Sequence, residues 1–285
     1  MTCSREGYSD AQKLKNSGEM SVKIGKTEKY IYERLAEKGA MMFMLVDPVD
    51  YRTPDEAVKT AVESIDAGAD LILVGGSIGA QGELLDYVCK GIKDKSGGTP
   101  VILFPGNIAT LTRYADAVYF MSLLNARNPY WITQVQVLAA PIVKMLNIEP
   151  IPVGYIVVAP GGTVGWVGDA NLVPREKPKI AAGLAMAGEF LGNRFIATDV
   201  GSNPKLQHSG PVPPQMIRAV RASISVPYIV AGGIRTEKSL RETFRAGADM
   251  VQIGTAIEQS HNARKMAALF ARVTKEEGMR KLKKS

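Results

Sequence analysis

The chain has 285 residues, of which 46% are apolar and 22% charged, and its formal net charge is +7. These proportions are close to those of average globular proteins, and they exclude a disordered tail protein and a collagen-like fibre. The longest apolar runs are far shorter than the ~20 residues that span a bilayer, which excludes an integral membrane protein.

The cysteine content and the N-terminus suggest where the protein works. Two cysteines, Cys3 and Cys89, are too few for a disulfide framework, and this favours a reducing compartment. The first residues, Met-Thr-Cys-Ser-Arg-Glu-Gly-Tyr, contain no apolar segment like that of a secretory signal. We therefore expect a cytoplasmic protein.

Basic residues gather at the C-terminal end, where residues 279–285 contain four of them. A basic end can attract anionic lipid or nucleic acid, but cations also stabilise the C-terminal end of a helix. The sequence contains no RNP motif, no zinc-finger spacing and no interleaving of aromatic and basic residues. We expect no nucleic-acid partner, whereas peripheral contact with a membrane stays open.

The first predicted elements are a polar extension over residues 1–26 and a helix over Thr27–Lys38. Beyond them, eight short apolar and β-branched runs alternate with helical patterns. These runs are apolar throughout, which is typical of parallel strands buried on both faces. They span Met42–Val46, Leu71–Val74, Val101–Phe104, Ala117–Met121, Gly154–Val158, Arg194–Thr198, Tyr228–Ala231 and Met250–Ile253.

Four of the intervening helices have recognisable start signals. A cap residue or a proline in the first turn favours helix starts at Thr53-Pro54, Asn128-Pro129, Pro213-Pro214 and Thr236. Two helices end in the same four residues, Ala-Gly-Ala-Asp, at 67–70 and 246–249, and a strand follows each at once. Because glycine is a common C-terminal cap, this repeat predicts two similar helix-to-strand junctions.

Eight strands with intervening helices predict an α/β protein in which residues 27–285 form one (β/α)8 barrel. A doubly wound open sheet is the alternative. About a dozen residues, 105–116, separate the third and fourth strands, which is too few for a full crossover helix. We therefore expect the third helix to be missing or reduced, and the Thr27–Lys38 helix to cover the floor of the barrel.

Small and polar residues follow each predicted strand, at the end where barrels of this class place their active sites. Gly232-Gly233 and Gly254-Thr255, after the seventh and eighth strands, are the most specific of these segments. Glycines let backbone amides approach an oxyanion, and a short helix after the eighth strand would direct its N-terminus to the same point. This pattern predicts a phosphate site, although tight turns alone also use such glycines.

Three polar side chains at this end are candidates for chemistry. Asp47 and Ser77, after the first and second strands, are oxygen ligands that could share a Mg²⁺ ion, although each could instead serve a turn. Asp199, after the sixth strand, could bind ligand hydroxyls or act as a general base, or form an Asx turn.

Other chemistry-bearing residues carry weaker signals. The sequence has no catalytic triad, P-loop or Rossmann motif, and His208 and His261 are expected at the surface. Cys89 is expected to be a packing residue. Tyr119, Phe120, Met121 and Tyr155 are assigned to the core. Trp131 and Trp166 could line an apolar groove, form an oligomer contact or belong to the core.

Several longer segments resemble one known family. They are Leu45-Val-Asp-Pro, Leu73-Val-Gly-Gly-Ser-Ile-Gly, Leu103-Phe-Pro-Gly-Asn, Phe120-Met-Ser-Leu-Leu-Asn, Asn128-Pro-Tyr-Trp-Ile, the stretch Gly154–Ala170, and Val230-Ala-Gly-Gly-Ile-Arg-Thr. In this order and spacing, from about Lys38 to Glu258, the chain resembles the geranylgeranylglyceryl phosphate synthases and the related heptaprenylglyceryl phosphate synthases. It is most similar to their larger archaeal subgroup.

The resemblance implies a modified (β/α)8 barrel without an ordinary third helix, and a Mg²⁺-dependent prenyltransferase that assembles as a homo-oligomer. Such an enzyme joins sn-glycerol 1-phosphate to geranylgeranyl diphosphate, which is the first ether bond of archaeal lipids. Asp47 and Ser77 would be the metal ligands, and Asp47 and Asp199 the catalytic residues. The residues that would bind substrate are Ala197, Thr198, Asp199, Val200, Gly201, Ser202, Asn203, Gly232, Gly233, Gly254 and Thr255.

The sequence also departs from the family pattern. Ala197, Asp199 and Asn203 stand where the family has Tyr, Glu and Gly, and Ala159 stands where it has Glu. Val49-Asp50 replaces Asp-Lys. These departures keep two alternatives open: another phosphate-binding barrel that uses FMN or a sugar phosphate, and a catalytically silent relative that binds lipid or phosphate.

Overall fold

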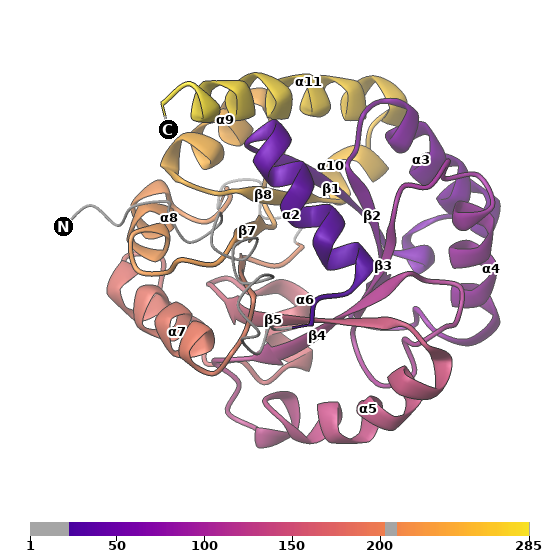
Figure 1. Ribbon diagram of the computed structural model, residues 1–285, viewed down its shortest axis with the longest axis horizontal. Helices are drawn as coiled ribbons and strands as arrows, with labels where there is room; N and C mark the ends of the chain where they lie inside the picture. Colours follow the sequence, from indigo (N-terminus) through magenta and orange to yellow (C-terminus); the bar gives the residue numbers. More distant parts are fainter. Residues whose placement is uncertain (1–22, 203–209, 285) are drawn as a thin grey trace, which may run out of the picture.

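The computed structural model describes residues 23–202 and 210–284, and in it eight parallel strands close into a barrel (Figure 1). Each strand pairs with its neighbours in chain order, and the first pairs with the last. The strands are β1 Met41–Val46, β2 Leu71–Gly76, β3 Val101–Pro105, β4 Ala117–Leu123, β5 Glu149–Val157, β6 Phe195–Asp199, β7 Tyr228–Ala231 and β8 Met250–Ile253. The predicted barrel is confirmed, and the open sheet is excluded.

Helices surround the barrel, and most begin where the sequence predicts. Thr53 Oγ1 accepts a hydrogen bond from the Glu56 amide, and Thr236 forms a reciprocal capping box with Ser239. The helices are α2 Lys26–Lys38, α3 Pro54–Asp66, α4 Gly82–Lys93, α5 Gln134–Leu146, α6 Gly162–Val167, α7 Pro178–Phe190, α8 Pro214–Arg221, α9 Glu237–Ala246, α10 Thr255–Glu258 and α11 Ala263–Leu282.

The helix predicted from Asn128 is divided into two elements. Asn128 caps a short 3-10 helix, η3 (Pro129–Trp131), by accepting from the Tyr130 amide at 2.9 Å. Thr133 then takes a backbone φ of −143°, outside the helical range, and α5 begins only at Gln134. A second 3-10 helix, η2 (Pro48–Asp50), follows β1.

The segment between β3 and β4 contains no helix. Residues 106–116 form turns and irregular backbone, so the predicted loss of the third helix is confirmed. In the ring of helices, α4 before β3 is therefore followed directly by α5 after β4 (Figure 1). Within the part of the chain that the structure describes, no α-helix packs on the barrel between α4 and α5, beside the β3–β4 connection.

Helix α2 crosses the floor of the barrel, at the N-terminal ends of the strands (Figure 1). Its first amides, those of Thr27 and Glu28, donate to the two carboxylate oxygens of Glu149 at 2.7 and 2.8 Å. The buried Glu28 carboxylate in turn receives two hydrogen bonds from the Arg194 guanidinium. These contacts bind α2 to the starts of β5 and β6, as expected from the sequence.

The Ala-Gly-Ala-Asp repeat makes the same junction twice. Gly68 and Gly247 have φ angles of 109° and 124°, which end the preceding helices. The carboxylates of Asp70 and Asp249 then accept from amides near the starts of the neighbouring strands, Met42 at 2.8 Å and Tyr228 at 3.0 Å. The aspartates thereby anchor β2 to β1 and β8 to β7.

Candidate functional site

A polar cavity lies at the C-terminal ends of the strands. It is lined by nine of the residues predicted for metal or substrate: Asp47, Asp199, Val200, Gly201, Ser202, Gly232, Gly233, Gly254 and Thr255. The Ser202 and Thr255 hydroxyl oxygens lie 2.8 Å apart, which joins the exits of β6 and β8. The fold therefore brings together residues that are more than 200 positions apart in the chain.

The two glycines after β7 line this polar cavity. Gly232 and Gly233 have φ angles of 77° and 69°, a conformation that residues with a Cβ rarely adopt. A Cβ on Gly232 would also lie 2.5 Å from a carboxylate oxygen of Asp199. Both features favour glycine here, and backbone without a Cβ can approach an anionic ligand closely.

Asp199 is buried at the end of β6 with hydrogen bonds to both carboxylate oxygens. The Tyr155 hydroxyl donates to Oδ2, and the Gly201 amide donates to Oδ1 at 2.6 Å. The second bond is the Asx turn that the sequence left open. Burial raises the pKa of Asp199 above its ordinary value, although the hydrogen bonds from Tyr155 and Gly201 oppose the rise.

Asp47 occupies the opposite wall, after β1. Its carboxylate accepts from the Val49 amide at 3.3 Å, so the predicted turn role is present. Burial raises the pKa of Asp47 to about 7, and the nearby charge of Asp50 adds to the rise. No ion pair within the described part of the chain neutralises Asp47.

Gly76, the residue before Ser77, lies against the Asp47 carboxylate. A Cβ on Gly76 would overlap the Asp47 carboxylate, so the carboxylate packs directly against the backbone that carries Ser77. A carboxylate and a hydroxyl are two oxygen ligands of the kind that Mg²⁺ takes while keeping several waters or phosphate oxygens. Residues 23–202 and 210–284 contain no group of three or more acidic, histidine or cysteine side chains that could hold a metal by themselves. The residues present thus fit a cation whose remaining ligands come from substrate.

Glu258, the last residue of α10, is a third carboxyl group at this end. Its Oε1 accepts from the Asp47 amide at 3.4 Å and from the Tyr51 hydroxyl at 3.5 Å. Burial raises the pKa of Glu258 to about 8, and the charges of Asp50 and Asp47 contribute to the rise. No sequence motif pointed to Glu258, because its distance from Asp47 depends on closure of the barrel between β8 and β1.

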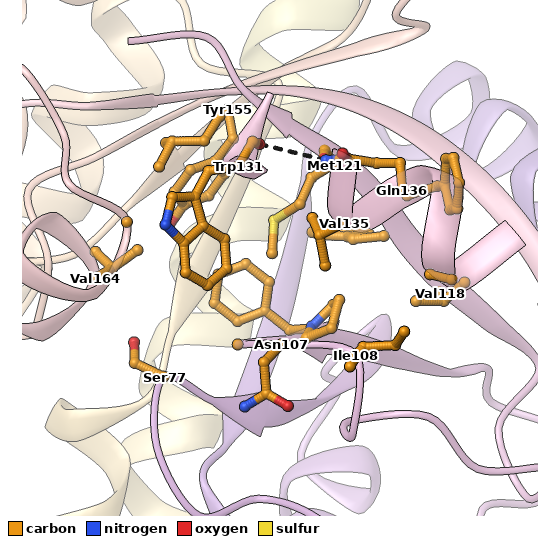
Figure 2. Close-up of a pocket in the computed structure, with 18 of the residues that line it drawn as sticks. Ser77, Asn107, Ile108, Val118, Met121, Trp131, Val135, Gln136, Tyr155 and Val164 are labelled. Atoms are coloured by element: carbon orange, nitrogen blue, oxygen red, sulfur yellow. Dashed lines mark hydrogen bonds between the residues drawn. The ribbon is translucent and has the colours of Figure 1, made fainter. Parts of the chain in front are cut away.

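A second, apolar groove adjoins the polar cavity. Figure 2 shows side chains from several elements that face this space, with Ser77 on one side and Val118 on the other. The groove lies where the third helix would otherwise pack, between the 106–116 segment, β4 and α5. Its lining includes Phe104, Ile108, Leu111, Val118, Phe120, Met121, Trp131, Val135, Ala139 and Val143.

Phe104 and Tyr155 mark the place where the apolar groove meets the polar cavity. Phe104 lines both spaces, and its ring centroid lies 5.8 Å from that of Tyr155. Tyr155 lines the groove while its hydroxyl reaches Asp199 in the cavity. A ligand with a polar head and an apolar tail could therefore occupy both spaces at once.

Three residues of the predicted substrate segment do not line the cavity. Ala197 is buried inside the barrel, and the Thr198 hydroxyl lies 2.6 Å from the Tyr228 hydroxyl on the outer side of the sheet. The period of two along a strand explains the outward direction of Thr198, whereas Ala197 faces inward like Asp199 but lies two residues nearer the start of β6. Asn203 lies outside the described residues.

The remaining expectations are mostly confirmed. Cys89 is buried among apolar side chains, and His261 is exposed, whereas His208 lies outside the described residues. Trp131 lines the apolar groove, but Trp166 is 83% exposed and does not. In the basic C-terminal end, Arg280 and Lys281 pair with Glu277 and Asp249, which agrees with a helix end.

Comparison with known proteins agrees with this geometry. The PcrB family matches residues 33–273. The geranylgeranylglyceryl phosphate synthase of Thermococcus gammatolerans is 51% identical over 244 residues, which cover 86% of this chain and 94% of that protein. The synthase of Pyrococcus horikoshii is 51% identical over 239 residues, which cover 84% of this chain and 91% of that protein.

Solved structures indicate the same family. The (S)-3-O-geranylgeranylglyceryl phosphate synthase of Thermoplasma acidophilum, in complex with sn-glycerol-1-phosphate, has a TM-score of 0.80 and 34% identity, covering 86% of this chain and 98% of that chain. The synthase of Thermoplasma volcanium has a TM-score of 0.81 and 35% identity, covering 87% and 97%. The chain therefore belongs to the PcrB family, among its geranylgeranylglyceryl phosphate synthases.

Proposed function

We propose that this protein transfers a geranylgeranyl group from its diphosphate to the primary hydroxyl of sn-glycerol 1-phosphate. The observation that carries the proposal is the contact between a polar cavity and an apolar groove, with the Tyr155–Asp199 pair at their junction. The cavity fits the glycerol phosphate, and the groove fits the prenyl chain. The two reacting atoms would then meet beside Asp199.

In this proposal the phosphate of the acceptor binds at the exits of β7 and β8. The backbone amides around Gly233 and Gly254 hold the anion, and the Ser202–Thr255 pair closes the side of the site. Fixing the phosphate also fixes the primary hydroxyl near the allylic carbon, which lowers the entropic barrier to attack.

Asp199 acts on that hydroxyl. The bond between the allylic carbon and the diphosphate oxygen breaks, a bond between this carbon and the glycerol oxygen forms, and the hydroxyl proton passes to the Asp199 carboxylate. Diphosphate leaves, so atoms and charge balance. Tyr155 and Gly201 hold the carboxylate in place.

Asp47 and Ser77 would hold the Mg²⁺ ion. The ion supplies positive charge to the leaving diphosphate. The unpaired Asp47 carboxylate, packed against the backbone that carries Ser77, supports this assignment. The apolar groove begins at Ser77, so the diphosphate lies between the metal residues and the prenyl chain.

The test is incubation of the full chain with sn-glycerol 1-phosphate, geranylgeranyl diphosphate and Mg²⁺, with and without EDTA. We expect an ether product of the correct mass that disappears with EDTA. Binding of both substrates without product would favour a silent relative and contradict the proposal. Product that persists in EDTA would overturn the metal assignment alone.

The cellular setting stays a prediction. Along residues 23–202 and 210–284, every helix is too short or too polar to cross a membrane. A cytoplasmic location, peripheral membrane contact and a homo-oligomer are expected from the sequence. Fractionation of cells and the mass of the purified protein in solution would test them.

A further inference from the structure

Gln252 is a buried polar side chain inside the barrel that the proposed chemistry does not use. It belongs to β8, is 4% exposed, and lines the polar cavity. In the strand register it pairs with Ala231 of β7, which pairs with Asp199 of β6. Gln252 and Asp199 therefore lie in the same layer of the barrel, separated by one small residue.

The amide of Gln252 is only partly satisfied. Its Nε2 donates to the Tyr119 hydroxyl over a long 3.4 Å, and its Oε1 has no hydrogen-bond partner among the described residues. Buried polar atoms in folded proteins are normally paired, so an amide oxygen left without a partner needs an explanation. A ligand hydroxyl in the cavity would supply the missing donor.

The side chains around Gln252 leave space for such a ligand. Ala231, on the preceding strand, lines the cavity, is small and carries no polar side-chain atom. Both oxygens of Asp199 already accept hydrogen bonds from the protein, which restricts how that carboxylate can meet a ligand. Gln252 is the next polar group in the layer.

We propose that Gln252 accepts a hydrogen bond from the secondary hydroxyl of the glycerol phosphate and thereby selects its enantiomer. This inference rests on the proposed function. The phosphate is held near Gly233 and Gly254, and the primary hydroxyl is held at Asp199. With two points fixed, the two enantiomers exchange the hydrogen and the hydroxyl on the central carbon. A single acceptor on one side of the cavity distinguishes them.

A purely structural role is the competing explanation, in which Gln252 only orients Tyr119. The two roles differ in one measurable ratio. We compare kcat/KM for sn-glycerol 1-phosphate with that for sn-glycerol 3-phosphate in the wild type and in Gln252→Leu. We expect the ratio to fall about tenfold in the variant, which is the loss of one hydrogen bond of ordinary strength.

Gln136→Leu is the matched control. Gln136 also has a buried amide oxygen without a partner, but it lines the apolar groove, where its Nε2 donates to backbone oxygens of Met121 and Trp131. Its replacement should change KM for the prenyl diphosphate and leave the enantiomer ratio as in the wild type. The melting temperature of each variant reports whether its fold is kept.

An acceptor that lacks the secondary hydroxyl, 3-hydroxypropyl phosphate, gives a second measurement. The wild type should lose about tenfold in kcat/KM with this acceptor, whereas Gln252→Leu should use it as well as it uses sn-glycerol 1-phosphate. An unchanged enantiomer ratio in a folded Gln252→Leu variant would overturn the inference. Absence of product from the wild type itself would instead contradict the proposed function.

Discussion

The two ends of this barrel differ in how their acidic side chains are paired. At the floor, acidic groups meet basic partners: Glu28 pairs with Arg194, Asp116 with Lys93, and Asp249 with both Arg221 and Lys281. Burial works against ionisation of Asp249, but Lys281 and Arg221 hold its pKa below the ordinary value. Charge at the floor therefore stabilises the fold.

At the mouth of the barrel, where the C-terminal ends of the strands meet, the carboxyl groups of Asp47, Asp199 and Glu258 lack such partners. Burial raises the pKa of Asp47 to about 7 and that of Glu258 to about 8, and the pKa of Asp199 is also raised. No ion pair of the described residues includes any of the three. Unpaired buried charge costs stability, so this end keeps groups that a cation and a substrate would satisfy. Substitutions at the floor should accordingly lower stability, whereas substitutions at the mouth should lower activity.

The largest expected effect is at the floor. Arg194→Leu leaves the buried Glu28 carboxylate without its partner, so the free energy of unfolding should fall by about 3–5 kcal/mol. Urea denaturation measures the change. Arg218→Leu, at an exposed position of α8, is the control and should cost less than ~0.5 kcal/mol.

A double variant, Glu28→Leu with Arg194→Leu, should recover most of the stability because it removes the unpaired charge as well. If the double variant is as unstable as the single one, then packing rather than charge explains the loss.

At the mouth, Asp47→Asn should lower kcat roughly 10²- to 10³-fold while the melting temperature stays near that of the wild type or rises. Steady-state kinetics at saturating Mg²⁺ measures this. Asp66→Asn removes the same charge from the exposed end of α3 and should leave kcat unchanged. An Asp47→Asn enzyme with full activity would refute the metal assignment.

Asp199→Asn should lower kcat about 10²-fold, because the amide keeps the shape of the carboxylate but cannot take a proton. KM for the prenyl diphosphate should stay near its wild-type value, since Asp199 lines only the polar cavity. Kinetics that vary each substrate in turn would check this, and equal losses for both substrates would argue for general damage to the site.

The smallest expected effect is a shift in pH dependence. The Tyr155 hydroxyl stabilises the ionised form of Asp199, so it opposes the rise that burial gives to the pKa of this carboxyl. In Tyr155→Phe the pKa of Asp199 should rise further. Because the base must be ionised, the variant should lose activity at a higher pH than the wild type when the medium is acidified. Its kcat should also be about tenfold lower than that of the wild type.

The pH profile of kcat/KM measures the position of this acid limb. Tyr228→Phe removes another buried tyrosine hydroxyl, one that contacts Thr198 on the outer side of the sheet, and should leave the limb in place. A Tyr155→Phe profile that matches the wild type would mean that the phenol does not act on the base.

Local patterns in the chain were sufficient to predict most of the fold. The uniformly apolar strand runs indicated a closed parallel barrel, and the short 105–116 interval indicated the missing helix, because both depend on nearby residues and on chain length. The position of Asp47, Ser77 and the glycines after the last two strands indicated that they are site residues, and the resemblance to a family implied the same roles. The polar cavity and the apolar groove contain them.

Only the tertiary structure decided how these residues act together. Tyr155 was assigned to the core, and Glu258 and Gln252 carried no motif, because their partners lie 44 to 211 positions away along the chain. The inward or outward direction of Ala197 and Thr198 depends on strand register, which a motif does not contain. Sequence therefore determined which chemical groups stand near the mouth. Barrel closure decided which of them share a hydrogen bond, a charge or a cavity.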